Sequence, residues 1–171
     1  MKIFTTAKLT RMGITAGLYI VLSLVVFPIS SGAIQVRISE GLTLLPLIFP
    51  ETAIALCVGC LLTNLITGCM LFDVFLGSLI TLVAGLLTAL IGKVIKNSVL
   101  KITVGGLFPV LLNAFLLPLI WWYCYGQLDY LYIVQVALVL VGQAVSVYAV
   151  GSIIYVATKK AKDKGLKGFT D

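Results

Sequence analysis

The stretch Ile34–Glu51, with the sequence IQVRISEGLTLLPLIFPE, decides how the rest of the chain is interpreted. It follows the first apolar run and carries Arg37, Glu40 and Glu51 in very apolar surroundings. Charges beside hydrocarbon are costly, so they usually face a cavity, a water path or a partner charge. If a helix over residues 38–48 extends back to Arg37, the Arg37 and Glu40 side chains lie on one face and can pair. The alternative is an outer loop with a surface ion pair.

The composition is that of an integral membrane protein. The chain has 171 residues, of which 61% are hydrophobic and 11% charged, whereas about a quarter of the residues of a soluble domain are charged. The net charge of +6 would suit nucleic acid, but the positive residues gather in short segments between apolar runs. We therefore expect residues 1–171 to form one transmembrane domain, in contact with the lipid bilayer of the cell membrane and not with nucleic acid.

Six apolar runs are expected to be helices, which makes the fold class all-α. The second run has about eleven residues, which is short for a hydrocarbon core of about 30 Å. A polar turn at residues 30–35 separates it from the first run. The expected spans are residues 12–29, 38–48, 51–67, 73–91, 103–123 and 132–157, followed by a basic tail at 158–171.

The distribution of lysines favours six crossings over five. If residues 38–48 cross the membrane and the N-terminus is cytoplasmic, the loop with Lys93, Lys96 and Lys101 and the lysines of the tail are all cytoplasmic, in agreement with the positive-inside rule. If residues 38–48 dip into the membrane and return, that loop falls outside, against the rule. The prediction is an integral membrane six-helix bundle with both termini cytoplasmic.

Several apparent motifs do not support catalysis or metal binding. Cys57 and Cys60 have the spacing of a redox or metal pair, but the chain contains no His and its other two cysteines are far apart. Gly92-Lys93 is followed by Val94, and Leu87 stands where a phosphate-binding loop would need its first Gly. We expect no enzyme activity, no metal and no cofactor.

Polar residues in or beside the spans are the candidates for a ligand site. Acidic acceptors, amides and aromatic faces at a similar depth suit a flat ligand that forms hydrogen bonds. For each residue alone, a hydrogen bond between helices is an equally good explanation. The candidates are Arg37, Glu40, Asn64, Asp73, Asn113, Trp121, Trp122, Gln135 and Gln143.

The first span carries small residues at a spacing that permits close helix packing. Gly13 and Gly17 lie one turn apart, and Ala16 flanks them. Small residues let membrane helices approach backbone to backbone. This ridge can pack inside the bundle or meet another membrane protein, and the first span is where we expect a partner to dock.

Two segments resemble the QueT family, the substrate-binding membrane subunits (S components) of energy-coupling factor (ECF) transporters assigned to queuosine precursors. The segments are AIQVRISEGLTLLPLIFPETAIALCVGCLLTNLITG and FDVFLGSLITLVAGLLTALIGK. The resemblance rests on the runs V-R-I-S-E, V-G-C-L-L-x-N-L and D-V-x-x-G-S-L. It implies a six-helix bundle with a ligand pocket near the outer face, partly closed by the loop between the first two helices.

The resemblance also implies partners and a substrate. The partners are a transmembrane coupling subunit and two ATPase subunits, and docking commonly uses an AxxxA motif, whose positions Gly13 and Gly17 occupy here. The small-molecule substrate is a 7-deazaguanine, such as the 7-cyano or 7-aminomethyl compound, or queuine. Two other functions stay open: an S component for another vitamin-like ligand, such as thiamine, folate or riboflavin, and a membrane scaffold subunit that does not transport.

Overall fold

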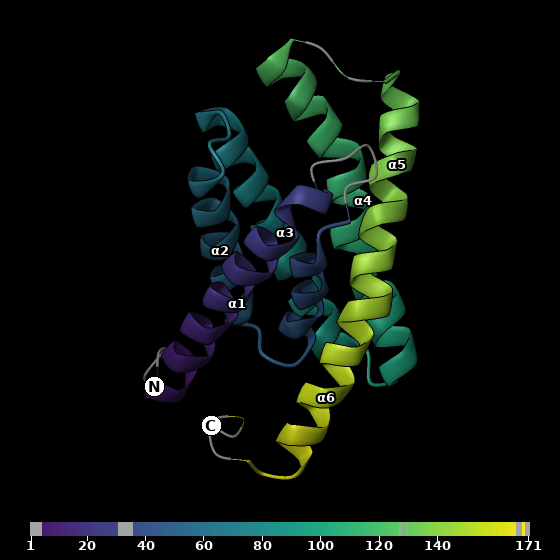
Figure 1. The fold of residues 1–171 in the computed structure, drawn as a ribbon. Coiled ribbons are helices and arrows are strands. Elements are labelled where there is room, and N and C mark those ends of the chain that lie inside the picture. Colours follow the sequence, from purple (N-terminus) through teal and green to yellow (C-terminus); the bar gives the residue numbers. More distant parts are fainter. Residues whose placement is uncertain (1–4, 31–35, 127, 129, 167–168, 170–171) are drawn as a thin grey trace.

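The computed structural model describes residues 5–30, 36–126, 128, 130–166 and 169. Most of the turn predicted at residues 30–35 and part of the tail predicted at 158–171 lie outside the described residues. The described chain consists of helices and the turns between them, without a strand (Figure 1). The predicted all-α class is confirmed.

Four helical segments are long and apolar enough to cross a membrane. The first belongs to α1 (Thr6–Ser30), which meets these criteria over Thr6–Val26. The last is one continuous segment made of α5 (Tyr132–Ala144), the π-helical turn η2 (Val145–Val150) and α6 (Gly151–Asp163). Between them are α3 (Leu71–Val94) and α4 (Ser98–Tyr125). These helices extend one to six residues beyond the predicted spans at most ends.

Two helical segments are too short to span the hydrocarbon core alone. The helix α2 (Thr52–Ile66) has 15 residues, or about 22 Å at 1.5 Å per residue. The segment η1 (Ile38–Leu47) is a 3-10 helix of 10 residues, or about 20 Å. Both fall short of about 30 Å. That these two segments cross the membrane stays a prediction, and so does the six-helix count.

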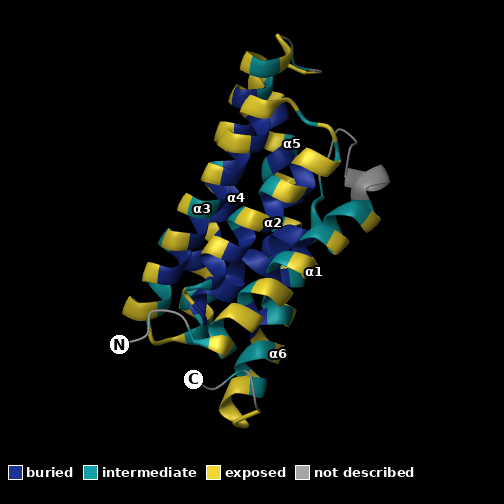
Figure 2. Cartoon of the chain, turned by 90° about the vertical axis from the view of Figure 1, so that its left-hand side faces the viewer, coloured by how far each residue is buried: buried dark blue, intermediate teal, exposed yellow. Residues whose placement is uncertain are grey.

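The surface of the described chain is apolar and much of its interior is polar. Large exposed side chains such as Val25, Leu131 and Ile153 are more than two-thirds exposed, and exposed residues run along the outer sides of the helices (Figure 2). Soluble monomers rarely expose such extended apolar surfaces. Buried polar residues, among them Glu40 and Gln143, lie in the middle. This arrangement suits a protein surrounded by lipid.

Arg11 and two lysines of α6, Lys159 and Lys162, lie at one end of the molecule, away from the partly buried Arg37. Arg11, near the start of α1, forms an ion pair of 2.7 Å with Glu51, just before α2. The Lys162 ammonium of α6 lies 4.9 Å from the ring centre of Phe49, and the Lys159 ammonium donates to Ser98 at the start of α4. Figure 1 shows that α1 begins and α6 ends at this same end.

Three polar side chains attach α1 to the rest of the bundle. They are four or eight residues apart in the sequence, which places them on one face of the helix. Arg11 pairs with Glu51, the Tyr19 hydroxyl donates to Glu40 over 2.5 Å, and the Ser23 hydroxyl donates to Ser39 over 2.7 Å. Between lipid-embedded helices there is no hydrophobic driving force, so close packing and polar contacts hold them together. We call Arg11, Tyr19 and Ser23 the polar ridge of α1.

The 3-10 helix η1 lies in the centre of the molecule, with every residue from Ser39 to Leu47 buried. η1 can occupy this central position because glycines stand where the neighbouring backbones contact it. A Cβ at Gly41 would lie 3.1 Å from the backbone nitrogen of Gly151, and a Cβ at Gly92 would lie 2.5 Å from the carbonyl oxygen of Leu47. The backbones of α3 and α6 therefore approach η1 directly, and η1 carries Glu40 into the core.

Candidate functional site

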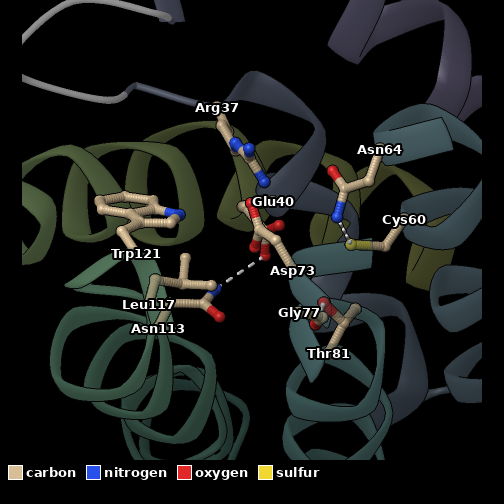
Figure 3. Close-up of a pocket in the computed structure, with 10 residues that line it drawn as sticks. All are labelled: Arg37, Glu40, Cys60, Asn64, Asp73, Gly77, Thr81, Asn113, Leu117 and Trp121. Carbon is tan, nitrogen blue, oxygen red and sulfur yellow. Dashed lines mark hydrogen bonds between the residues drawn. The ribbon is translucent and has the colours of Figure 1, made fainter. Parts of the chain in front are cut away.

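A small cavity lies where η1, α2, α3 and α4 meet (Figure 3). Its volume is about 10 Å³, which is room for about one water molecule. Six of the nine predicted site residues line it, together with four that were not predicted. The lining residues are Arg37, Glu40, Cys60, Asn64, Asp73, Gly77, Thr81, Asn113, Leu117 and Trp121.

Glu40 is fixed by hydrogen bonds from two different helices. Its side chain is 2% exposed. The Tyr19 hydroxyl donates to Oε1 over 2.5 Å, and the Asn113 amide donates to Oε2 over 3.3 Å. The same Asn113 nitrogen lies 3.2 Å from Oε1 of Gln143. A carboxylate held this way has its position set before any ligand arrives, and it retains unused acceptor capacity on both oxygens.

Arg37 directly precedes η1, and its side chain lines the cavity. Its backbone is extended, with φ −93° and ψ 98°, so Arg37 is not part of the helix and the predicted shared helical face with Glu40 does not exist. No ion pair within 4.0 Å joins these two described residues, which corrects the predicted pairing. The Arg37 guanidinium instead points into the cavity, toward Glu40 and Asp73 (Figure 3).

Asp73 is the second carboxylate of the site and lies in the first turn of α3. Negative charge is favoured there, because the helix dipole places partial positive charge at the N-terminal end. The Tyr125 hydroxyl donates to Oδ2 of Asp73 over 3.4 Å, a long contact. Asn64 faces Asp73 from the last turns of α2, with its amide nitrogen 3.7 Å from the sulfur of Cys60.

Gly77 lies one turn after Asp73 and leaves room in the cavity. A Cβ built at Gly77 would lie 3.4 Å from Nδ2 of Asn64, 3.6 Å from Oδ1 of Asp73 and 4.0 Å from Cδ2 of Leu117. These are ordinary contact distances, so the absent side chain is part of the space between the polar groups.

Three predicted site residues do not line the cavity. Gln143 lies behind Asn113 and is 1% exposed. Gln135 is buried on α5, and its Oε1 has no hydrogen-bond partner among the described residues. Trp122 is 58% exposed, because neighbouring residues on a helix point about 100° apart and Trp121 takes the inward direction.

The residues that the sequence interpretation missed carried weak signals. Cys60 precedes Asn64 by four residues, and Thr81 follows Gly77 by four, but both spacings are also typical of plain helix packing. Tyr19 is embedded in an apolar run. Its signal was the four-residue spacing of polar residues on α1, from Arg11 through Thr15 and Tyr19 to Ser23.

The predicted docking residues of α1 divide between two faces. At Gly13 and Gly17 a Cβ would meet nothing within 4 Å, so these glycines lie on the outer side of α1. Ala16 is partly buried, and its carbonyl oxygen lies 3.2 Å from a Cβ built at Gly59 of α2. The two glycines thus form an open face opposite the polar ridge.

Comparison with protein families gives a match over most of the chain. The family model described as QueT transporter matches residues 9–160. No curated protein matches the chain, and no solved structure matches it. The matched region includes every helix described above except the first residues of α1 and the last residues of α6. This chain belongs to the QueT transporter family.

Proposed function

We propose that this protein is the substrate-binding component of an ECF transporter in the cell membrane and that it binds a 7-deazaguanine in the cavity around Glu40. Membership of a transporter family supports a small-molecule substrate. The observation that carries the proposal is a buried carboxylate, oriented by Tyr19 and Asn113, facing a cavity with further polar groups. A buried polar group this costly is retained where it has a function.

The chemistry of the lining fits a guanine-like edge. Such an edge presents a ring N–H and an amino group side by side, and a carboxylate accepts two parallel donors well. Glu40 is the proposed acceptor, Asn64 supplies an amide donor for the carbonyl, and the Trp121 indole supplies a flat apolar wall. Since the cavity holds about one water molecule, a bicyclic ligand enters only when these walls move apart.

The remaining parts of the proposal concern orientation and coupling. The end that collects the lysines and Arg11 is assigned to the cytoplasm, because cytoplasmic segments of membrane proteins are enriched in positive residues. The first turn of α3, which carries Asp73, then lies at the outer end of that helix, and the cavity that Asp73 lines lies in the outer half of the membrane. The open face with Gly13 and Gly17 is assigned to a transmembrane coupling subunit, which together with two ATPase subunits would supply the energy.

Replacing Glu40 with Gln tests the ligand site. Gln preserves the shape and can still accept from Tyr19, but it removes the charge-assisted bonds to the ligand. Losing such a bond costs about 1.5–3 kcal/mol, so we expect roughly ten- to a hundredfold weaker binding of a 7-deazaguanine in calorimetry. Asp163→Asn is the matched control, because it removes an exposed carboxylate at the other end of the molecule. Unchanged affinity in folded Glu40→Gln would remove Glu40 from the site.

A further inference from the structure

Three lysine side chains come together at the end of the molecule where α3 ends and α4 begins. Lys101 lies in the first turn of α4, and Lys159 and Lys162 lie in the last two turns of α6. The neighbouring charges that act on Lys101 are those of Lys159 and Lys162, and both are positive. In the part of the chain that the structure describes, no carboxylate oxygen lies within 4.0 Å of these three ammonium groups. We call the three residues the lysine cluster.

Two lysines of the cluster are held in place by uncharged oxygens. Nζ of Lys101 donates to the carbonyl oxygen of Gly92 over 2.8 Å, and Nζ of Lys159 donates to Oγ of Ser98 over 2.6 Å. Both lysine side chains are half-buried. An ammonium group has three N–H donors. Each of the two therefore keeps donor capacity for an acceptor that binds between them.

The helix dipoles explain the position of Lys101 but not that of Lys159. Gly92 lies in the last turn of α3, where the dipole places partial negative charge that favours a cation. Ser98 is the first residue of α4, where the partial charge is positive, and the first turn of α4 contains no acidic residue. Like charges brought together cost free energy, and an anion bound at the lysine cluster would offset that cost.

Exposed apolar side chains adjoin the lysine cluster. Val99 follows Ser98, and Val156 lies one turn before Lys159; both valines are more than half exposed. Both helices belong to segments that are long and apolar enough to cross a membrane. Lysines near the ends of such helices place their ammonium groups at the level of the lipid headgroups. The lysine cluster thus combines unpaired positive charge with an apolar surface beside it.

We propose that the lysine cluster binds the phosphate group of an anionic phospholipid. The phosphate oxygens accept from Lys101 and Lys159, Lys162 adds a third positive charge, and the acyl chains lie along the exposed apolar side chains of α4 and α6. Basic pockets between membrane helices bind anionic headgroups in this way. The inference is independent of the ligand proposed for the cavity, because the lysine cluster lies at the opposite end of α3 from Asp73.

The first test compares two lipids that differ in net charge. Phosphatidylglycerol is anionic, whereas the phosphate of phosphatidylcholine is neutralised by its own trimethylammonium group. The delipidated protein in a non-ionic detergent is titrated with each lipid, and native mass spectrometry measures the bound fraction. Charge-assisted bonds are worth roughly ten- to a hundredfold in affinity, so phosphatidylglycerol should bind about that much more tightly. Equal affinity for the two lipids would overturn the inference.

Inorganic phosphate separates a lipid site from a site for a free anion. It supplies the same acceptor oxygens but makes no contact with the exposed apolar side chains. When it replaces chloride at constant ionic strength, it should leave phosphatidylglycerol bound. Displacement of the lipid by inorganic phosphate would identify a site for free phosphate and would overturn the assignment to a lipid.

A pair of double variants locates the site. Lys101→Gln with Lys159→Gln should lower affinity for phosphatidylglycerol to that for phosphatidylcholine, while the Gln amides can still donate to the same protein oxygens. The matched control, Lys96→Gln with Lys160→Gln, removes two exposed lysines outside the cluster and should lose less than about fivefold, because exposed charges contribute little. Equal losses in the two double variants would indicate diffuse attraction and contradict a defined site. Thermal unfolding checks that each variant is folded, and if the first is not, the comparison of lipids on the unaltered protein still decides.

Discussion

Adding one methyl group to the cavity should separate ligand binding from stability. The change is Gly77→Ala. A Cβ at Gly77 would lie 3.4–4.0 Å from Asn64, Asp73 and Leu117, so it enters without a clash and occupies the space between the polar groups. Ala also favours a helix interior over Gly by about 1 kcal/mol. The unliganded protein should therefore be as stable as before, or more so.

The bound state should respond in the opposite direction. With a ligand in place the same methyl group would be excess volume, and overpacking typically costs about 1–3 kcal/mol. This corresponds to roughly five- to a hundredfold weaker binding. The assay is thermal unfolding in detergent, with and without 7-aminomethyl-7-deazaguanine, together with calorimetry of the same samples. The unfolding temperature without ligand should hold or rise, and the stabilisation by ligand should shrink.

Gly17→Ala provides the control, because it makes the same helix substitution where a Cβ would meet nothing within 4 Å. It should gain the same helix preference and keep full affinity. If Gly77→Ala binds as tightly as Gly17→Ala, the methyl group does not compete with the ligand. The cavity between α2, α3 and α4 would then not be the ligand site.

Three further predictions concern orientation, docking and the basic end. A cysteine at Lys96, in a background without the native cysteines, should react with a membrane-impermeant maleimide in inside-out vesicles and not in intact cells. Leu at both Gly13 and Gly17 should leave the unfolding temperature and ligand affinity unchanged, because both positions are open, yet abolish co-purification with the ATPase subunits by holding a partner helix away. Arg11→Gln should destabilise the protein by about 3–5 kcal/mol in thermal unfolding, since it leaves the largely buried Glu51 carboxylate without its cation.

Each of these predictions has a control. A cysteine at Tyr130, at the opposite end, should be labelled in intact cells, and labelling of Lys96→Cys there would reverse the assigned orientation. Normal co-purification of the double Leu variant would exclude the glycine face as the docking surface. Combining Arg11→Gln with Glu51→Gln should recover part of the lost stability, because the lone buried charge is gone. A double variant no more stable than Arg11→Gln would contradict the ion-pair explanation.

The order of the helices and the end at which the lysines gather follow from the sequence. Apolar length and the placement of charges are one-dimensional properties, so they can be read directly from the chain. The same reasoning grouped Arg37, Glu40, Asn64, Asp73 and Gln135 by depth, and all of these except Gln135 line one cavity.

Rotation about the helix axis is what the sequence did not reveal. Helix α4 is apolar on nearly all sides, so no polar face indicated that Trp121 points inward and Trp122 outward. The 3-10 geometry of η1 was equally hidden, because its periodicity differs little from that of an α-helix over ten residues. The Arg37–Glu40 pairing was predicted on the assumption of an α-helical face and is wrong for that reason.

The depth of η1 has a consequence for how the protein is made. The translocon releases segments into lipid according to their apolar length. A ten-residue segment that contains Glu40 is too short and too polar to insert into lipid on its own. The backbone of η1 rests against Gly92 and Gly151, and Gly151 begins α6, which is synthesised after the other helices described. Until α6 is inserted, the newly made chain therefore lacks one of the backbones against which η1 packs, and loss of α6 should leave η1 less firmly held, even though Tyr19 and Asn113, which bind Glu40, are already present.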